Sequence, residues 1–116
     1  MSEYVEYLKE VFEQFGSVTI RKMFGGYGIY HNGLMFALVS DDMLYLKADE
    51  VNAGDFGKLG LGQFEYSKSG RTVKLSYYRA PDEIMEDREE AAVWARRSYE
   101  AALRARSPKS KPKKKK

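Results

Sequence analysis

The sequence predicts an α+β domain, with an antiparallel sheet of about five strands and the N- and C-terminal helices packed on one face. Three observations support this fold class. Apolar residues recur at helical spacing near both ends of the chain. The middle of the chain is rich in aromatic and β-branched residues, and Asn32-Gly33 divides it as a tight hairpin turn would.

The first element is predicted to be an amphipathic helix that starts near Ser2. Glutamates occupy one side of the expected helix, and Gly16 is placed to end it. The apolar side has the three-or-four spacing of a buried helix face: Tyr4, Leu8, Val11 and Phe15.

Residues 18–47 are predicted to form three or four antiparallel strands. Asn32 and Gly33 tolerate the positive φ that both central positions of a type I′ turn require, so segments 29–31 and 34–39 should form a hairpin. Ser40-Asp41-Asp42 then leads into a further strand at 43–47.

The second half of the chain is predicted to contain an irregular link, a hairpin and a long helix. Residues 49–62 should form a short helical turn or loop held by a few apolar residues, and segments 64–66 and 72–78 a hairpin. Asp87 and Glu90 have the spacing of a reciprocal capping box at the start of the last helix.

Charge divides the 116-residue chain into a body and a tail. The whole chain has a net charge of +3, but residues 1–106 hold 14 basic and 17 acidic residues. We therefore expect a single domain over 1–106 and a disordered lysine-rich tail over 107–116 that attracts nucleic acid. Its basic residues are Lys109, Lys111, Lys113, Lys114, Lys115 and Lys116.

No apolar run approaches the roughly 20 residues that span a bilayer, and the first ten residues alternate acids with apolar residues. These features predict a cytoplasmic protein with no membrane association.

Candidate catalytic groups are scarce. The chain has no Cys and one His, so we expect neither a metal site nor a cofactor. His31 flanks the predicted hairpin turn, where we expect a solvated turn residue. The glycines of Gly25-Gly26-Tyr27-Gly28 do not have phosphate-loop spacing and should mark a bulge or a close backbone approach. We predict a protein that is not an enzyme.

Basic and aromatic residues in the predicted strands suggest a binding surface. Arg21 and Lys22, with Lys47, Lys74 and Arg79, would form one basic patch if their registers align. Alternatively, they are solvated positions that discourage edge pairing. Six strand tyrosines could stack on unpaired bases if they faced outward, or could belong to the core: Tyr27, Tyr30, Tyr45, Tyr66, Tyr77 and Tyr78.

The stretch Arg-Lys-Met-Phe-Gly-Gly at 21–26 resembles the TfoX (Sxy) N-terminal domain family. The resemblance continues in segments 28–39, 44–47, 64–66 and 77–81. The resemblance covers about residues 4–105. It implies a compact α+β domain, often dimeric, that is associated with regulators of natural competence. In characterised members it works with the cyclic-AMP receptor protein, a transcription activator. Those longer members add a C-terminal helical domain.

The first functional hypothesis is a non-enzymatic regulatory module that contacts a protein partner while the tail attracts DNA without sequence preference. The second is a protein-interaction or dimer scaffold with no DNA role, and the third is a small-molecule-binding domain. The residues that we expect to bind a partner or ligand are Arg21, Lys22, Phe24, Gly25, Gly26, Lys47 and Arg79.

Overall fold

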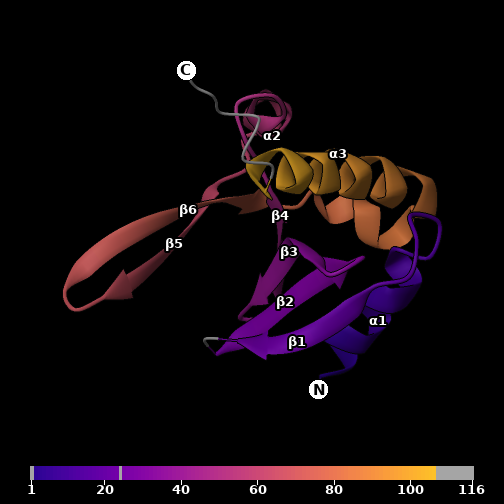
Figure 1. Cartoon of the computed structure of the whole chain (residues 1–116), viewed down its shortest axis with the longest axis horizontal. Helices are drawn as coiled ribbons and strands as arrows, with labels where there is room; N and C mark the ends of the chain where they lie inside the picture. The colour runs from indigo at the N-terminus through magenta and orange to yellow at the C-terminus, as the bar shows by residue number, and fades with distance from the viewer. Residues whose placement is uncertain (1, 24, 107–116) are drawn as a thin grey trace.

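The computed structural model describes residues 2–23 and 25–106, and it has the predicted α+β fold (Figure 1). The tail at 107–116 and Phe24 lie outside the described residues. The helices are α1 (Glu3–Val11), α2 (Ala53–Lys58), the 3-10 helix η1 (Asp82–Glu86) and α3 (Arg88–Arg106). The strands are β1 (Thr19–Met23), β2 (Gly26–His31), β3 (Leu34–Ser40), β4 (Met43–Lys47), β5 (Gln63–Lys68) and β6 (Arg71–Arg79).

The strands form one antiparallel sheet of six, in the order β1-β2-β3-β4-β6-β5. The sheet has six strands where about five were expected, because segment 18–31 divides into β1 and β2. Asn32 and Gly33 have φ values of 51° and 78°, which confirms the predicted turn between β2 and β3.

A β-bulge in β3 decides which side chains face the helices. Ile29 pairs with Ala37 but Tyr30 pairs with Met35, so Phe36 has no partner in β2. The ring of Phe36 is fully buried and packs against Phe12, at 5.5 Å between centroids. Beyond the bulge, Tyr30 and Met35 lie on the opposite face of the sheet from Ile29 and Ala37.

All three α-helices pack against the same face. Phe15, just after α1, contacts Phe36 at 5.1 Å and Tyr99 of α3 at 5.9 Å between ring centroids. Phe56 of α2 stacks on Tyr78 of β6 at 5.2 Å. One core cluster therefore joins the helices to β2, β3, β4 and β6.

The ends of the helices show where sequence reasoning was incomplete. Asp87 caps α3 as predicted, because its Oδ1 accepts from the amides of Glu89 and Glu90 at 3.1 Å. The reciprocal half of the box was wrong, since the Asp87 amide donates to the carbonyl of Ile84 instead. Helix α1 ends at Val11, earlier than expected, and a turn continues to Gly16.

The link before β5 contains the short helix α2 and a few apolar anchors, as expected. Phe56 is fully buried, and Ala53 and Leu61 pack against the core cluster. Val51 and Leu59 are 67% and 53% exposed, so these two apolar residues do not hold the link to the body.

The C-terminal end of α3 is fastened to the end of β4 by a bidentate ion pair. Arg104 donates to the two oxygens of Asp49 at 2.6 Å and 2.9 Å. These hydrogen bonds hold the pKa of the Asp49 carboxyl below its usual value, although burial opposes the shift.

Asp49→Asn should destabilise the fold at neutral pH and change its response to acid. The folded carboxyl has the lower pKa, so its contribution to stability is present above about pH 4 and is lost as the pH falls through the folded pKa. We expect the difference in Tm between the variant and the wild type to shrink in acid, as measured by thermal unfolding. Asp55→Asn, which breaks a more exposed pair with Arg97, is the control. A difference that stays constant into strong acid would contradict this role.

Candidate partner-binding face

One face of the sheet carries apolar residues that are not part of the core cluster formed with the helices. The strand registers place a continuous row of side chains there, from β1 across to β6. We call this surface the uncovered face. Its residues include Arg21, Met23, Gly28, Tyr30, Met35, Leu38, Tyr45, Lys47 and Tyr77, and at its edge Arg79, which pairs with Tyr45.

The centre of the uncovered face is apolar and tightly packed. A Cβ on Gly28 would lie 2.8 Å from the sulfur atoms of both Met23 and Met35, so the glycine leaves room for these two side chains to converge over it. Leu38 and Tyr77 are 5% and 8% exposed although no described helix covers them. The centre is thus a second small apolar cluster outside the main core.

Aromatic rings extend this surface toward the β5–β6 hairpin. Tyr45 meets Phe64 edge to face, with 4.8 Å between ring centroids, and Phe64 stacks on Tyr66 at 6.3 Å. Tyr66 is 40% exposed. The apolar band therefore runs from the middle of the sheet onto a hairpin that projects from the body (Figure 1).

Two cations lie over rings of the uncovered face. The Arg21 guanidinium lies 5.2 Å from the ring centroid of Tyr30, and the Lys47 ammonium lies 5.2 Å from the ring centroid of Tyr77. Lys47 also donates to Ser76 Oγ at 2.8 Å. Burial lowers the pKa of the Lys47 amine, and the nearby Asp49 opposes that shift. No carboxylate among the described residues forms an ion pair with Arg21 or Lys47.

The other sequence-predicted binding residues do not all join this face. Lys22 pairs with Tyr27 and so lies on the opposite face from Arg21. Gly25 has a φ of 78° in the turn that joins β1 to β2. A Cβ on Gly26 would clash with the carbonyl oxygen of Val39, which confirms the predicted close backbone approach.

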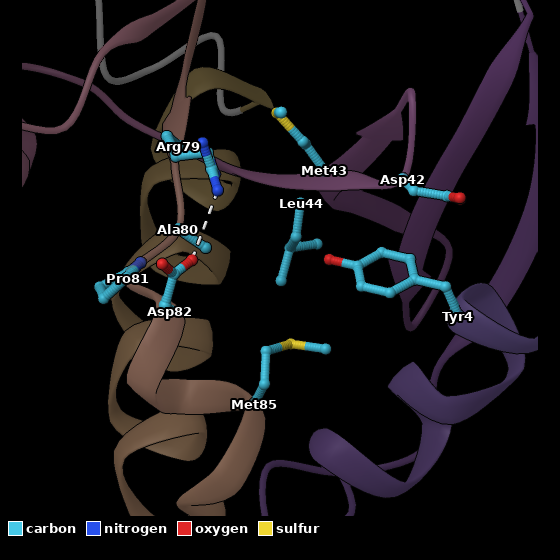
Figure 2. A pocket seen from close by; sticks show the side chains of 9 residues that line it. All are labelled: Tyr4, Asp42, Met43, Leu44, Arg79, Ala80, Pro81, Asp82 and Met85. Carbon is cyan, nitrogen blue, oxygen red and sulfur yellow. Dashed lines mark hydrogen bonds and ion pairs between the residues drawn. The ribbon is translucent and has the colours of Figure 1, made fainter.

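Arg79 lies at a separate pocket, shown in Figure 2. Its guanidinium contacts Asp82 Oδ1 at 3.4 Å, while Tyr4 faces the same hollow from α1. The pocket holds about 150 Å³, which suits a few waters better than a metabolite. The register pairs Arg79 with Tyr45, so Arg79 leaves the sheet on the uncovered side, but its guanidinium is turned to Asp82 at the pocket. The predicted basic patch is therefore divided by partners: Arg21 and Lys47 have no ion pair among the described residues, whereas Arg79 has Asp82.

His31 has a structural environment, contrary to the expected solvated position. Its Nδ1 lies 2.8 Å from the carbonyl oxygen of Ser17, which requires a proton on Nδ1. Its ring packs against Phe15 at 4.6 Å and Tyr99 at 5.0 Å. The single imidazole thus fastens the segment after α1 to the β2–β3 hairpin and α3.

Sequence reasoning identified the tyrosines as possible surface residues but did not separate them. Tyr30, Tyr45, Tyr66 and Tyr77 share the uncovered side, whereas Tyr27 and Tyr78 pack against the core. It missed Met23, Met35 and Leu38 as parts of the surface. Their alternation in the sequence is interrupted by the bulge at Phe36, so period-two reasoning would assign Met35 to the wrong face.

Two features relevant to function are not found among the described residues. No group of three or more acidic or histidine side chains could hold a metal ion there. No helix in the described part of the chain is both long and apolar enough to cross a bilayer.

Comparison with known proteins defines the class of this domain. The TfoX N-terminal domain matches residues 10–102, and the chain belongs to that family. It is 32% identical over 99 residues to "Protein Sxy" of Escherichia coli K12, covering 85% of this chain and 47% of the relative.

Two further relatives carry transformation names. "DNA transformation protein TfoX1" of Aliivibrio fischeri is 30% identical over 78 residues, which cover 67% of this chain and 37% of the relative. "DNA transformation protein TfoX" of Haemophilus influenzae is 35% identical over 72 residues, which cover 60% of this chain and 33% of the relative. The matched region thus spans between a third and a half of each relative.

The packing of Tyr77 predicts a measurable alkaline response. Burial raises the pKa of Tyr77 to about 12, and the neighbouring Tyr30 adds to the shift. The stability that the buried, neutral phenol contributes is fully present below the unfolded pKa of 10.0, and it is lost as the pH rises through the folded pKa of Tyr77.

Tyr77→Phe should therefore lose less stability than the wild type as the pH rises above 10.0, and should lack the last phenol to ionise. Urea unfolding and the ultraviolet absorbance of phenolate measure these two effects. Tyr66→Phe, on the exposed hairpin, serves as the control. An unchanged alkaline profile in Tyr77→Phe would show that this phenol is not buried.

Proposed function

We propose that this domain is a non-enzymatic regulator of the TfoX type and that it binds a protein partner on the uncovered face. The observation that carries the proposal is an apolar centre beside two cations that have no carboxylate partner among the described residues. Around the buried Leu38 and Tyr77, the side chains of Met23, Met35 and Tyr45 are partly exposed. Partly exposed apolar patches are typical of protein-binding sites, and methionine side chains adapt readily to a partner. Arg21 and Lys47 add a requirement for negative charge.

The expected partner therefore offers apolar side chains next to carboxylates. Family membership and the names of the relatives support a role in controlling DNA transformation. The resemblance further suggests a transcription activator of the cyclic-AMP receptor type as the partner, because characterised family members work with that protein.

A homodimer remains a prediction of the family resemblance. Two copies joined through their uncovered faces would place Arg21 and Lys47 of both copies in one interface, where four positive charges oppose association. We therefore infer that a dimer contact, where one forms, lies on another surface, and that the uncovered face serves a different protein.

Replacing Arg21 and Lys47 together by Gln should weaken binding to a purified activator of the cyclic-AMP receptor type. We expect a loss of roughly tenfold or more, which corresponds to about 1.4 kcal/mol, because carboxylates of the activator would lose both of their cationic partners. Isothermal titration calorimetry with the activator and cyclic AMP measures the change.

The matched control is Lys9→Gln with Lys58→Gln, which removes the same charge from α1 and α2. Equal losses in both double variants would assign the attraction to net charge and contradict a specific face. Full affinity in the Arg21 and Lys47 variant would place the partner elsewhere.

We also propose that the lysine-rich segment 107–116 adds non-specific attraction to DNA. Its six lysines can neutralise up to about six phosphates, so the slope of log affinity against log salt should become shallower by at most about 5 when the segment is deleted. Fluorescence anisotropy with labelled duplexes of two unrelated sequences measures this. An unchanged slope after deletion would exclude the segment from DNA binding.

A further inference from the structure

The hairpin of β5 and β6 stands free of the body over much of its length (Figure 1). Strand β6 pairs with β4 only at 77–79, and the amide of Ala48 reaches the carbonyl of Ser76. Residues 71–74 pair with β5 alone, which gives a two-stranded ribbon roughly 13 to 14 Å long. Ser69 and Gly70 form its tip with φ values of 54° and 76°, a tight turn that keeps the ribbon narrow.

The tip of this ribbon carries an unfavourable pair of like charges. Lys68 and Arg71 lie directly opposite each other in the register, and like charges in that arrangement destabilise a hairpin. Neither has an ion-pair partner among the described residues, whereas Lys74, further along the ribbon, lies 3.9 Å from Glu65. A bound polyanion would relieve the repulsion between Lys68 and Arg71.

Charge is also separated across the whole domain. The strands carry one acid, Glu65, and seven cations: Arg21, Lys22, Lys47, Lys68, Arg71, Lys74 and Arg79. The rest of residues 1–106 holds 16 acids and seven cations. Eight of those acids lie on α1, on η1 and in the first turn of α3, on the side of the molecule away from the ribbon (Figure 1).

The C-terminal end of α3 lies near the base of the ribbon. Arg104 binds Asp49, which follows β4, and the adjacent Ala48 is hydrogen-bonded to Ser76 of β6. The last turn of α3, which ends at Arg106, therefore lies at the base of the ribbon.

From these observations, we propose that the β5–β6 ribbon is a binding arm for duplex DNA. The major groove, about 12 Å wide, admits a two-stranded ribbon, and the Lys68 and Arg71 side chains at the tip would reach the phosphates on its walls. The acidic helices point away, so they do not oppose the approach. Phosphate contacts of this kind carry little sequence information, so the arm would bind DNA without base preference. This activity is independent of the protein contact proposed for the uncovered face.

The test uses the full chain with Lys68→Gln and Arg71→Gln, both at exposed positions of the ribbon. Loss of two phosphate contacts should make the slope of log affinity against log salt shallower by about 1.8, and should lower the affinity on the order of tenfold at low salt. Fluorescence anisotropy with a labelled duplex measures both. Circular dichroism checks that the fold is retained.

Lys9→Gln with Lys22→Gln removes the same charge at positions outside the ribbon and is the control. We expect this control to have nearly the same slope of log affinity against log salt as the wild type. Equal slopes in the two double variants would show attraction by net charge and would overturn the proposal. A ribbon variant that keeps wild-type affinity for the duplex but loses affinity for poly-glutamate would also overturn it, because the arm would then serve an acidic protein surface.

Discussion

The register between β2 and β3 is the constraint on which both surfaces of this domain depend. Side chains alternate between the two faces of a sheet, so a shift of one residue exchanges core and surface. The bulge at Phe36 shifts the pairing of β2 with β3 by one residue. As a result the Phe36 ring lies in the helix-covered core, whereas Tyr30 and Met35 lie on the uncovered face beside Gly28.

The hydrophobic core that stabilises the domain lies on the helix-covered side of the sheet, so the other side is available for binding. The rings of Phe12, Phe15 and Phe36 join the end of α1 to the sheet, and Phe56 joins α2 to β6. With stability concentrated there, the uncovered face can keep apolar and cationic groups that contribute to recognition. The β5–β6 ribbon is also free to bind a partner, because β6 pairs with β4 at only three residues and the rest of the ribbon is not part of the packed body.

Much of the fold could be predicted because its signals are local. Asn32-Gly33 specifies its turn through φ values that few residues tolerate, and Asp87 specifies a helix start through one side-chain oxygen. His31 shows the limit of such reasoning. Its position beside the turn was readable, but Phe15, Ser17 and Tyr99 come from three other parts of the chain, and their convergence depends on how the helices pack.

By itself, the sequence determined the fold class, the two hairpins, the terminal helices and the concentration of lysine after residue 106. Only the tertiary structure decided which strand residues share a face: Arg21 and Lys47 lie on the uncovered face, Lys22 lies on the other side, and Arg79 turns to a separate pocket. The physical reason is that turns and caps depend on neighbouring residues, whereas the two faces of a sheet depend on register, on bulges and on which helices cover them.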